Sequence, residues 1–164
     1  MENLNEYIAL YKEQLENGKI QKAYSGLVKY TLTLKAYLSK NLADKFSFGN
    51  MSQGYMDYTY FPFFNTFLRE NKLRFGIVLN HQKVRFELWL MGQNSEIQKK
   101  YWTFLKTTKW NAGRVSMPQY SVLEVVLIEN PNFKDLSDLS HKIEKEVISY
   151  SEEIINYLKE NYIE

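Results

Sequence analysis

Apolar residues recur every three or four positions near the start of the chain, the spacing that places side chains on one face of a helix. Gly18 follows residues 4–17, at a position typical of a glycine that ends a helix; the stripe before it consists of Leu4, Tyr7, Ile8, Tyr11 and Leu15. A second helix is predicted from about Ile20 to just before Asn41. We expect the two helices to pack as a hairpin.

A third periodic segment ends the chain. It begins near Asp135 or Ser137 and runs to about Tyr162, with an apolar stripe of Leu136, Leu139, Ile143, Val147, Tyr150, Ile154 and Tyr157 or Leu158. At ~1.5 Å per residue this helix would be about 40 Å long, more than a domain of this size usually needs. Its far end is therefore expected to overhang the domain or to meet a partner.

The middle of the chain alternates between apolar and polar residues, which is typical of strands. Leu73–Asn80 and Lys83–Met91 both show this pattern, and His81-Gln82 between them predicts a two-residue hairpin loop. Such a loop would pair Leu79 with Val84, Ile77 with Phe86, Phe75 with Leu88, and Leu73 with Leu90. We interpret the resulting apolar side as core.

Two further strands and one helix complete the prediction. Tyr55–Phe63 is rich in aromatic residues, and Ser121–Ile128 is apolar on both faces, which favours a central or covered strand. Asn94 suits the N-cap of a helix that follows it. The order α-α-β-β-β-α-β-α indicates one α+β domain over residues 1–164, with a four-stranded, mostly antiparallel sheet packed by helices.

The other side of the predicted hairpin carries polar side chains. In the expected register a carboxylate lies beside a position without a side chain, because Arg74 faces Trp89, Gly76 faces Glu87, and Val78 faces Arg85. A glycine permits close approach of a ligand. The interpretation is a small-molecule site; the candidate ligand-binding residues are Tyr58, Tyr60, Arg74, Gly76, Arg85, Glu87, Trp89 and Trp102. The alternatives are a purely structural polar face and a protein interface.

Other chemical signals are weaker. Gly92 and Asn94 at the start of a helix are candidates for binding an anion, although Asn94 itself would use one backbone donor. Asp57 and Glu87 could form a carboxylate pair for acid–base chemistry or Mg²⁺. Phosphate-loop, dinucleotide-binding and hydrolase motifs are absent from the sequence. No cofactor, no metal site and no defined catalytic residue is predicted.

Composition narrows the function classes. The chain has no cysteine and two histidines, which excludes disulfides and thiolate chemistry. Its net charge of +2 argues against general attraction to nucleic acid or membranes. Residues 97–123 contain five basic residues and no acid, whereas the segment beyond Leu123 is acidic; we interpret this as two solvated helix faces, with a nucleic-acid patch as the alternative. Without a signal peptide or spanning segment, a cytoplasmic location is expected.

Four segments resemble a known family. They are YKEQLENGKIQKAYSGL (Tyr11–Leu27), SQGYMDYTYF (Ser52–Phe61), LRFGIVLNHQKVRFELWLMGQN (Leu73–Asn94) with the QKKYW that follows, and ENPNFKDLSDL (Glu129–Leu139). In this order they resemble DUF7000, a family of small uncharacterised bacterial proteins. The resemblance implies a bacterial cytoplasmic protein and supplies no activity, cofactor or site residue.

Three functional hypotheses remain. The first is a noncatalytic binding module whose polar sheet face accepts a small anionic or aromatic ligand. The second is a protein-interaction component, including a homodimer, that uses the long C-terminal helix. The third is an enzyme that acts through Asp57 and Glu87.

Overall fold

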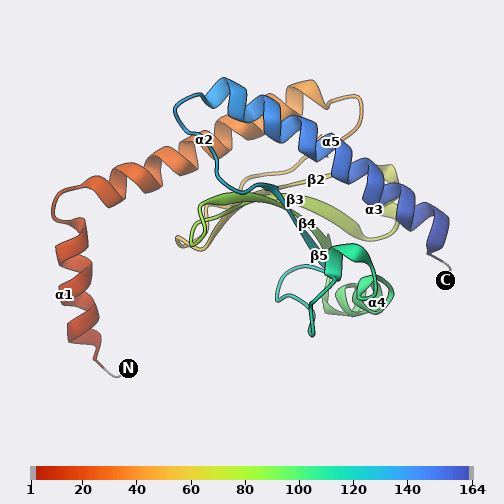
Figure 1. Ribbon diagram of the computed structural model, residues 1–164, viewed down its shortest axis with the longest axis horizontal. Coiled ribbons are helices and arrows are strands. Elements are labelled where there is room, and N and C mark those ends of the chain that lie inside the picture. The colour runs from red at the N-terminus through yellow and green to blue at the C-terminus, as the bar shows by residue number, and fades with distance from the viewer. Residues whose placement is uncertain (1–2, 163–164) are drawn as a thin grey trace.

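The computed structural model describes residues 3–162. It consists of an antiparallel sheet whose one side is covered by two long helices, α2 (Lys19–Asn41) and α5 (Leu136–Asn161) (Figure 1). The predicted α+β class is confirmed. In these residues, no helix is both long enough and apolar enough to cross a lipid bilayer.

The sheet has five strands, one more than predicted, and their spatial order follows the chain. They are β1 (Ser47–Phe48), β2 (Tyr58–Phe64), β3 (Leu73–Asn80), β4 (Arg85–Gly92) and β5 (Leu123–Ile128), and every neighbouring pair is antiparallel. The missed strand β1 has only two residues, too few to show alternation. β5 lies at the edge of the sheet, so the prediction of a central strand there is wrong, and its middle residues are only half-buried.

The hairpin of β3 and β4 has a different register from the predicted one. Its loop spans residues 81–84, in which Val84 adopts a left-handed backbone (φ 47°), and the Asn80 side chain accepts a hydrogen bond from the Lys83 amide. The pairs are therefore Leu79 with Phe86, Ile77 with Leu88, Phe75 with Leu90, and Leu73 with Gly92. Every predicted pair is wrong by two residues. A shift of two leaves the side chains of β3 and β4 on their predicted faces, since the period of a strand is two. Val84, predicted to lie in the core opposite Leu79, is instead exposed in the turn.

The main core lies between the sheet and the two long helices. Phe61, Phe75, Ile77, Phe86 and Leu88 are completely buried there. α5 buries its apolar stripe from Leu139 onward, whereas Leu136, predicted to be buried at its start, is 46% exposed. The C-terminal end of α5 does not overhang as expected, because Tyr162 stacks on Tyr101 with ring centroids 5.0 Å apart. Tyr101 belongs to α4 (Ser95–Leu105), whose start is capped by Asn94 as predicted.

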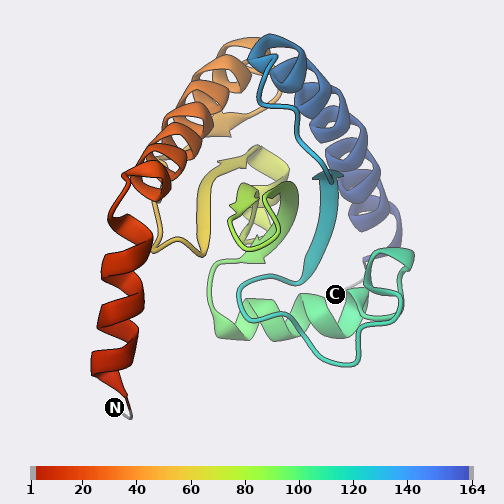
Figure 2. The same ribbon diagram turned by 60° about the vertical axis from the view of Figure 1, so that its left-hand side comes forward.

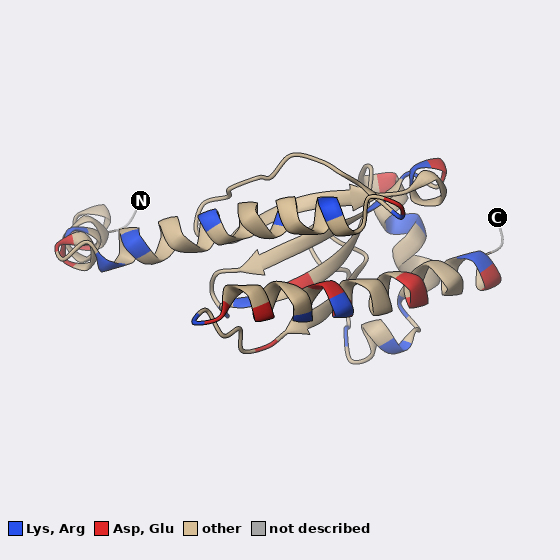
Figure 3. Cartoon of the chain, turned by 90° about the horizontal axis from the view of Figure 1, so that it is seen from above, with Lys and Arg blue, Asp and Glu red and all other residues tan. Residues whose placement is uncertain are grey.

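α2 and α5 also have complementary charges. Figure 3 shows only basic charges along α2, whereas α5 carries many acidic residues with a few basic ones. The Tyr37 hydroxyl donates to the Glu144 carboxylate over 2.6 Å, and just beyond α2 Lys45 pairs with Glu152 over 3.2 Å. Part of the acidic face predicted to be solvated is therefore used to join the two helices.

The first helix, α1 (Leu4–Leu15), projects from the rest of the molecule (Figures 1 and 2). None of its residues is buried, and it does not fold back on α2, so the predicted helical hairpin is wrong. Gly18, at φ 72°, makes the turn between the two helices, and the Asn17 side chain caps the amide of Lys19. Two short elements, α3 (Thr66–Glu70) and the 3₁₀ turn η1 (Lys109–Asn111), complete the fold.

Candidate functional site

The side of the sheet that faces away from α2 and α5 carries a second, smaller cluster of apolar side chains. Val78, Trp89 and Met91 are buried in it, and Tyr58 and Tyr60 pack against them half-buried. All five residues belong to β2, β3 and β4 and point away from the main core because side chains alternate along a strand. We call this side of the sheet the open face.

A cavity of about 340 Å³ lies on the open face. Tyr58, Tyr60 and Arg74 of the sheet line it together with Trp89, Met91 and Gly92. Its remaining walls come from two loops, through Ser52, Gly54, Tyr55 and Asp57 before β2 and through Tyr120 before β5. The structure therefore brings together five predicted site residues: Tyr58, Tyr60, Arg74, Trp89 and Gly92.

Glu87 is excluded from this cavity and is bonded entirely within the chain. One carboxylate oxygen accepts from Arg85 Nε over 2.7 Å and from Asn80 Nδ2 over 3.0 Å, and the other accepts from Trp89 Nε1 over 2.9 Å. Arg85 also pairs with Glu129 at the surface. Glu87 is only 2% exposed, so this network is a structural element that holds the Trp89 ring in place.

Gly76 does not leave an open position beside Glu87. The two-residue shift places it opposite Trp89, and the Met91 side chain fills the space above it: a Cβ at Gly76 would lie 2.7 Å from Met91 Cε. The expected pairing of Gly76 with Glu87 is therefore wrong. The glycine makes room for a methionine of the same chain, and the cavity opens beside that methionine.

Trp102 and Asn94 also lie away from the cavity. Trp102, on α4, packs against the main core. At the start of α4 the Asn94 side chain accepts from the Ile97 amide, and Gln98 Oε1 accepts from the Gly92 amide over 2.6 Å. Two backbone donors at the candidate anion site, the amides of Gly92 and Ile97, are thus already used by the chain itself.

Aromatic contacts shape the cavity. The rings of Tyr58 and Trp89 meet edge to face with centroids 4.8 Å apart, and Tyr58 lies 6.4 Å from the ring of Tyr120. Burial, and then the nearby carboxylates of Glu124 and Glu87, raise the pKa of Tyr58, so its hydroxyl stays protonated at neutral pH. The wall thus offers flat apolar rings and a hydroxyl that can donate a hydrogen bond.

Asp57 has a local structural role at the cavity rim. Its Oδ1 accepts from the amides of Tyr55 (2.8 Å) and Tyr58 (2.7 Å), and these bonds lower the pKa of the carboxyl. Because Glu87 is buried and fully bonded, the geometry gives no acid–base pair. In residues 3–162, no three acidic or histidine side chains gather closely enough to hold a metal ion.

His81 lies half-buried in the hairpin loop. Its Nε2 is 2.7 Å from the Thr59 hydroxyl, which is itself directed at the Gln53 carbonyl, so His81 Nε2 carries the proton and donates to Thr59. Burial lowers the pKa of His81, and the charge of Asp57 opposes this only in part. The neutral form of His81 therefore connects the hairpin loop to Thr59 of β2.

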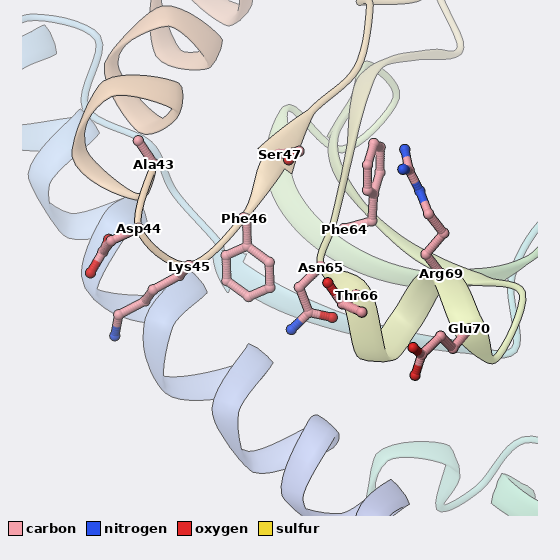
Figure 4. Close-up of a pocket in the computed structure, with 10 residues that line it drawn as sticks. All are labelled: Ala43, Asp44, Lys45, Phe46, Ser47, Phe64, Asn65, Thr66, Arg69 and Glu70. Carbon is pink, nitrogen blue, oxygen red and sulfur yellow. The ribbon is translucent and has the colours of Figure 1, made fainter.

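A larger hollow of about 500 Å³ lies between the end of α2 and α3. Figure 4 shows that its charged side chains diverge: Lys45 points away from the centre, and the Arg69 guanidinium extends beside Phe64. Asn65 uses its side chain to cap α3. Without convergent polar groups, this hollow is a weaker candidate than the aromatic cavity.

Sequence reasoning missed five cavity residues: Ser52, Gly54, Tyr55, Met91 and Tyr120. Alternation along β4 puts Met91 on the same face as Glu87 and Trp89, so that signal was present. Tyr55 and Tyr120 lie in loops without regular spacing, and only the folded chain brings them to the sheet.

Comparisons with known proteins identify the family of this chain and no further relative. The model of the domain of unknown function DUF7000 matches residues 4–158, from the start of α1 almost to the end of α5. No match to the chain was found among curated proteins or among solved structures. Because the matched residues make up nearly the whole sequence, the chain belongs to the DUF7000 family.

Proposed function

We propose that this protein is a noncatalytic binding module for a small molecule with a flat apolar part. The observation that carries the proposal is the 340 Å³ cavity on the open face, walled by Tyr58, Tyr60, Trp89 and Tyr120. Its volume lies within the range of roughly 300–1,000 Å³ that is typical of ligand pockets. Apolar rings with a few polar groups at the rim are the usual lining of such sites.

Two of the aromatic walls are held by contacts within the chain itself. Trp89 is fixed by its bond to Glu87, and Tyr58 is fixed between Trp89 and the turn at Asp57. A site whose aromatic side chains are already ordered loses less conformational entropy on binding. The rings can stack on a planar ligand, and the protonated Tyr58 hydroxyl can donate to it.

A thermal-shift screen with nucleosides, nucleotides and aromatic carboxylates tests the proposal. A ligand at about 100 times its Kd adds roughly 2.7 kcal/mol to stability, which raises Tm by several degrees in a domain of this size. Tyr120→Ala removes a half-exposed wall of the cavity and should reduce the shift. Leu32→Ala, at a similarly exposed position on α2 and away from the cavity, is the matched control and should leave the shift unchanged.

Two results would overturn the proposal. One is a screen in which no compound raises Tm. The other is a shift that survives both Tyr120→Ala and Tyr58→Leu, which would place binding elsewhere on the molecule.

We propose self-association as a second function, through α1 and not through the C-terminal helix. α5 uses its apolar stripe inside the domain, whereas α1 exposes Leu4 (45%), Tyr7 (67%), Ile8 (52%) and Tyr11 (66%) on one side. Two such stripes in a symmetric pair would cover on the order of 1,000 Å², near the lower limit of specific interfaces. The expected product is a weak dimer.

Sedimentation velocity from micromolar to submillimolar concentration tests the dimer. Ile8→Glu places a charge in the apolar stripe and should give a monomer, whereas Ala9→Glu adds the same charge on the opposite side of α1 and should leave association intact. Wild-type protein that stays monomeric over this range, or equal effects of the two variants, would contradict the proposal.

A further inference from the structure

A second hollow adjoins the aromatic cavity at one end of the open face. It has a volume of about 200 Å³ and is lined by Phe64, Arg69, Lys72, Leu73, Arg74 and Gln93. These residues come from the end of β2, from α3 and the start of β3, and from the end of β4, which meet here because the strands are antiparallel. The lining contains three cations and no acidic side chain.

The three cations lack acidic partners within the described residues 3–162. Ion pairs are formed there by Arg85 with Glu87 and by Arg114 with Glu124, but none involves Arg69, Lys72 or Arg74. Three uncompensated positive charges around one hollow repel one another and attract an anion. This end of the open face therefore has a charge that the chain itself does not neutralise.

One of the three is held by an aromatic ring. The Arg69 guanidinium lies 4.5 Å from the centroid of the Phe64 ring, a cation–π contact that keeps the side chain extended along the hollow. In Figure 4 the Arg69 guanidinium lies next to the Phe64 ring. A planar, positioned guanidinium is the group that best matches the oxygens of a phosphate.

Arg74 joins the two hollows. It lines both of them, is exposed, and pairs in register with Met91, which also lines the aromatic cavity. A molecule with its ring between Tyr58, Trp89 and Tyr120 would therefore direct a substituent past Arg74 toward Lys72 and Arg69. The two hollows thus share Arg74 as a common wall, and one elongated molecule can contact both.

We propose that the ligand is a planar aromatic compound that carries a phosphate group, the chemical class of the nucleoside monophosphates and aryl phosphates. This inference rests on the proposed function of the aromatic cavity and specifies its ligand. A phosphate has about −1.5 to −2 charges and three acceptor oxygens at neutral pH, which suits two guanidiniums and an ammonium better than a single carboxylate does. The aromatic part binds in the cavity, and the phosphate binds among the three cations.

Isothermal titration calorimetry with matched pairs tests this inference. The probes are four nucleoside monophosphates with their nucleosides, 4-nitrophenyl phosphate with 4-nitrophenol, and inorganic phosphate alone. At least one phosphorylated member should bind ten or more times more tightly than its uncharged partner. It should also bind more tightly than inorganic phosphate, and its affinity should fall as salt is added.

Two variants locate the phosphate. The double variant Arg69→Gln/Lys72→Gln should weaken the phosphorylated member about tenfold and leave the uncharged member unchanged. Arg74→Gln, at a residue that also lines the aromatic cavity, should weaken the phosphorylated member more than the uncharged member. Lys29→Gln on α2 removes the same charge from a remote exposed position and should change neither affinity. Equal binding of a ring compound with and without its phosphate overturns the phosphate assignment and leaves the aromatic site standing. Failure of all these ring compounds, together with a negative screen above, overturns the binding module as well.

Discussion

The arginines at the two ends of the open face differ in their acidic partners. At the hairpin end, Arg85 bonds to Glu87 and Glu129, and Glu87 in turn bonds to Asn80 and Trp89. At the other end, Arg74 lies beside two further cations without an acidic partner among the described residues. A charged side chain whose hydrogen-bond and ion-pair partners lie in its own chain stabilises the fold. A charged side chain that lines a hollow without an acidic partner is available to a ligand.

The largest expected loss of stability is at the hairpin end of the open face, where Arg85 has its acidic partners. Glu87→Ala leaves Arg85, Asn80 and the Trp89 N–H without their buried acceptor, and loss of one member of a buried ion pair costs about 3–5 kcal/mol. Urea denaturation measures this loss. Glu129→Ala removes the exposed partner of the same arginine and should cost less than about 1 kcal/mol. Similar losses in the two variants would show that the Glu87 network is not structural.

A smaller effect is expected between the two ends, at Gly76. Gly76→Ala places a methyl group 2.7 Å from Met91 Cε, so the methionine must move toward the cavity; overpacking of this kind costs about 1 kcal/mol. We expect lower stability in urea and weaker ligand binding together. Gly26→Ala on α2, where no atom lies within 4 Å, should instead be stabilising because alanine favours helix. Unchanged stability and binding in Gly76→Ala would mean that Met91 does not fill this space.

Acid should destabilise the hairpin end through His81. Burial lowers the pKa of His81 in the folded protein below its unfolded value near 6.5, so the unfolded chain binds more protons just below that pH. Stability is therefore complete above about pH 6.5 and is lost as the pH falls toward the folded pKa. Urea midpoints measured across this window should fall in the wild type and fall less in His81→Gln, with His141→Gln as the control. An equal fall in all three proteins would assign the effect to other groups.

The smallest effect on stability is expected at the end of the open face that carries Arg74. Arg74 is exposed and has no acidic partner, so Arg74→Gln should change the free energy of unfolding by no more than about 0.5 kcal/mol. Urea denaturation of this variant beside Glu87→Ala measures the contrast directly. A loss of stability comparable to that of Glu87→Ala would remove the distinction between the two ends of the open face.

Much of the fold was predictable from local pattern. The alternation of Leu73–Asn80 and Lys83–Met91 correctly assigned the side chains of β3 and β4 to the core or to the open face, but not Val84, which lies exposed in the turn. Asn94 correctly predicted the start of α4. The helical stripe of α5 was also confirmed, apart from the exposed Leu136 at its start and the overhang at its end. These features depend on interactions between residues close in sequence or on a simple period, which a single sequence displays.

The candidate site was predictable only in part. Tyr58, Tyr60, Arg74 and Trp89 were identified because they share one face of the strands. Trp102 was wrongly placed beside them because the position of α4 relative to the sheet depends on its packing against the main core. The basic hollow was missed because Arg69 and Lys72 reach it from α3 and from a left-handed turn residue, with no spacing that would group them with Arg74.

By itself, the sequence determined which side chains point to which side of the sheet, because the two-residue period of a strand is a local property that survives a shift of two positions. The tertiary structure alone decided three further features. They are the four-residue loop that sets the register, the methionine that fills the space at Gly76, and the helix α1 that stays apart from α2. None of them leaves a periodic trace along the chain: the register depends on the conformation of four loop residues, the Met91 contact forms only when β3 and β4 meet, and α1 buries none of its residues.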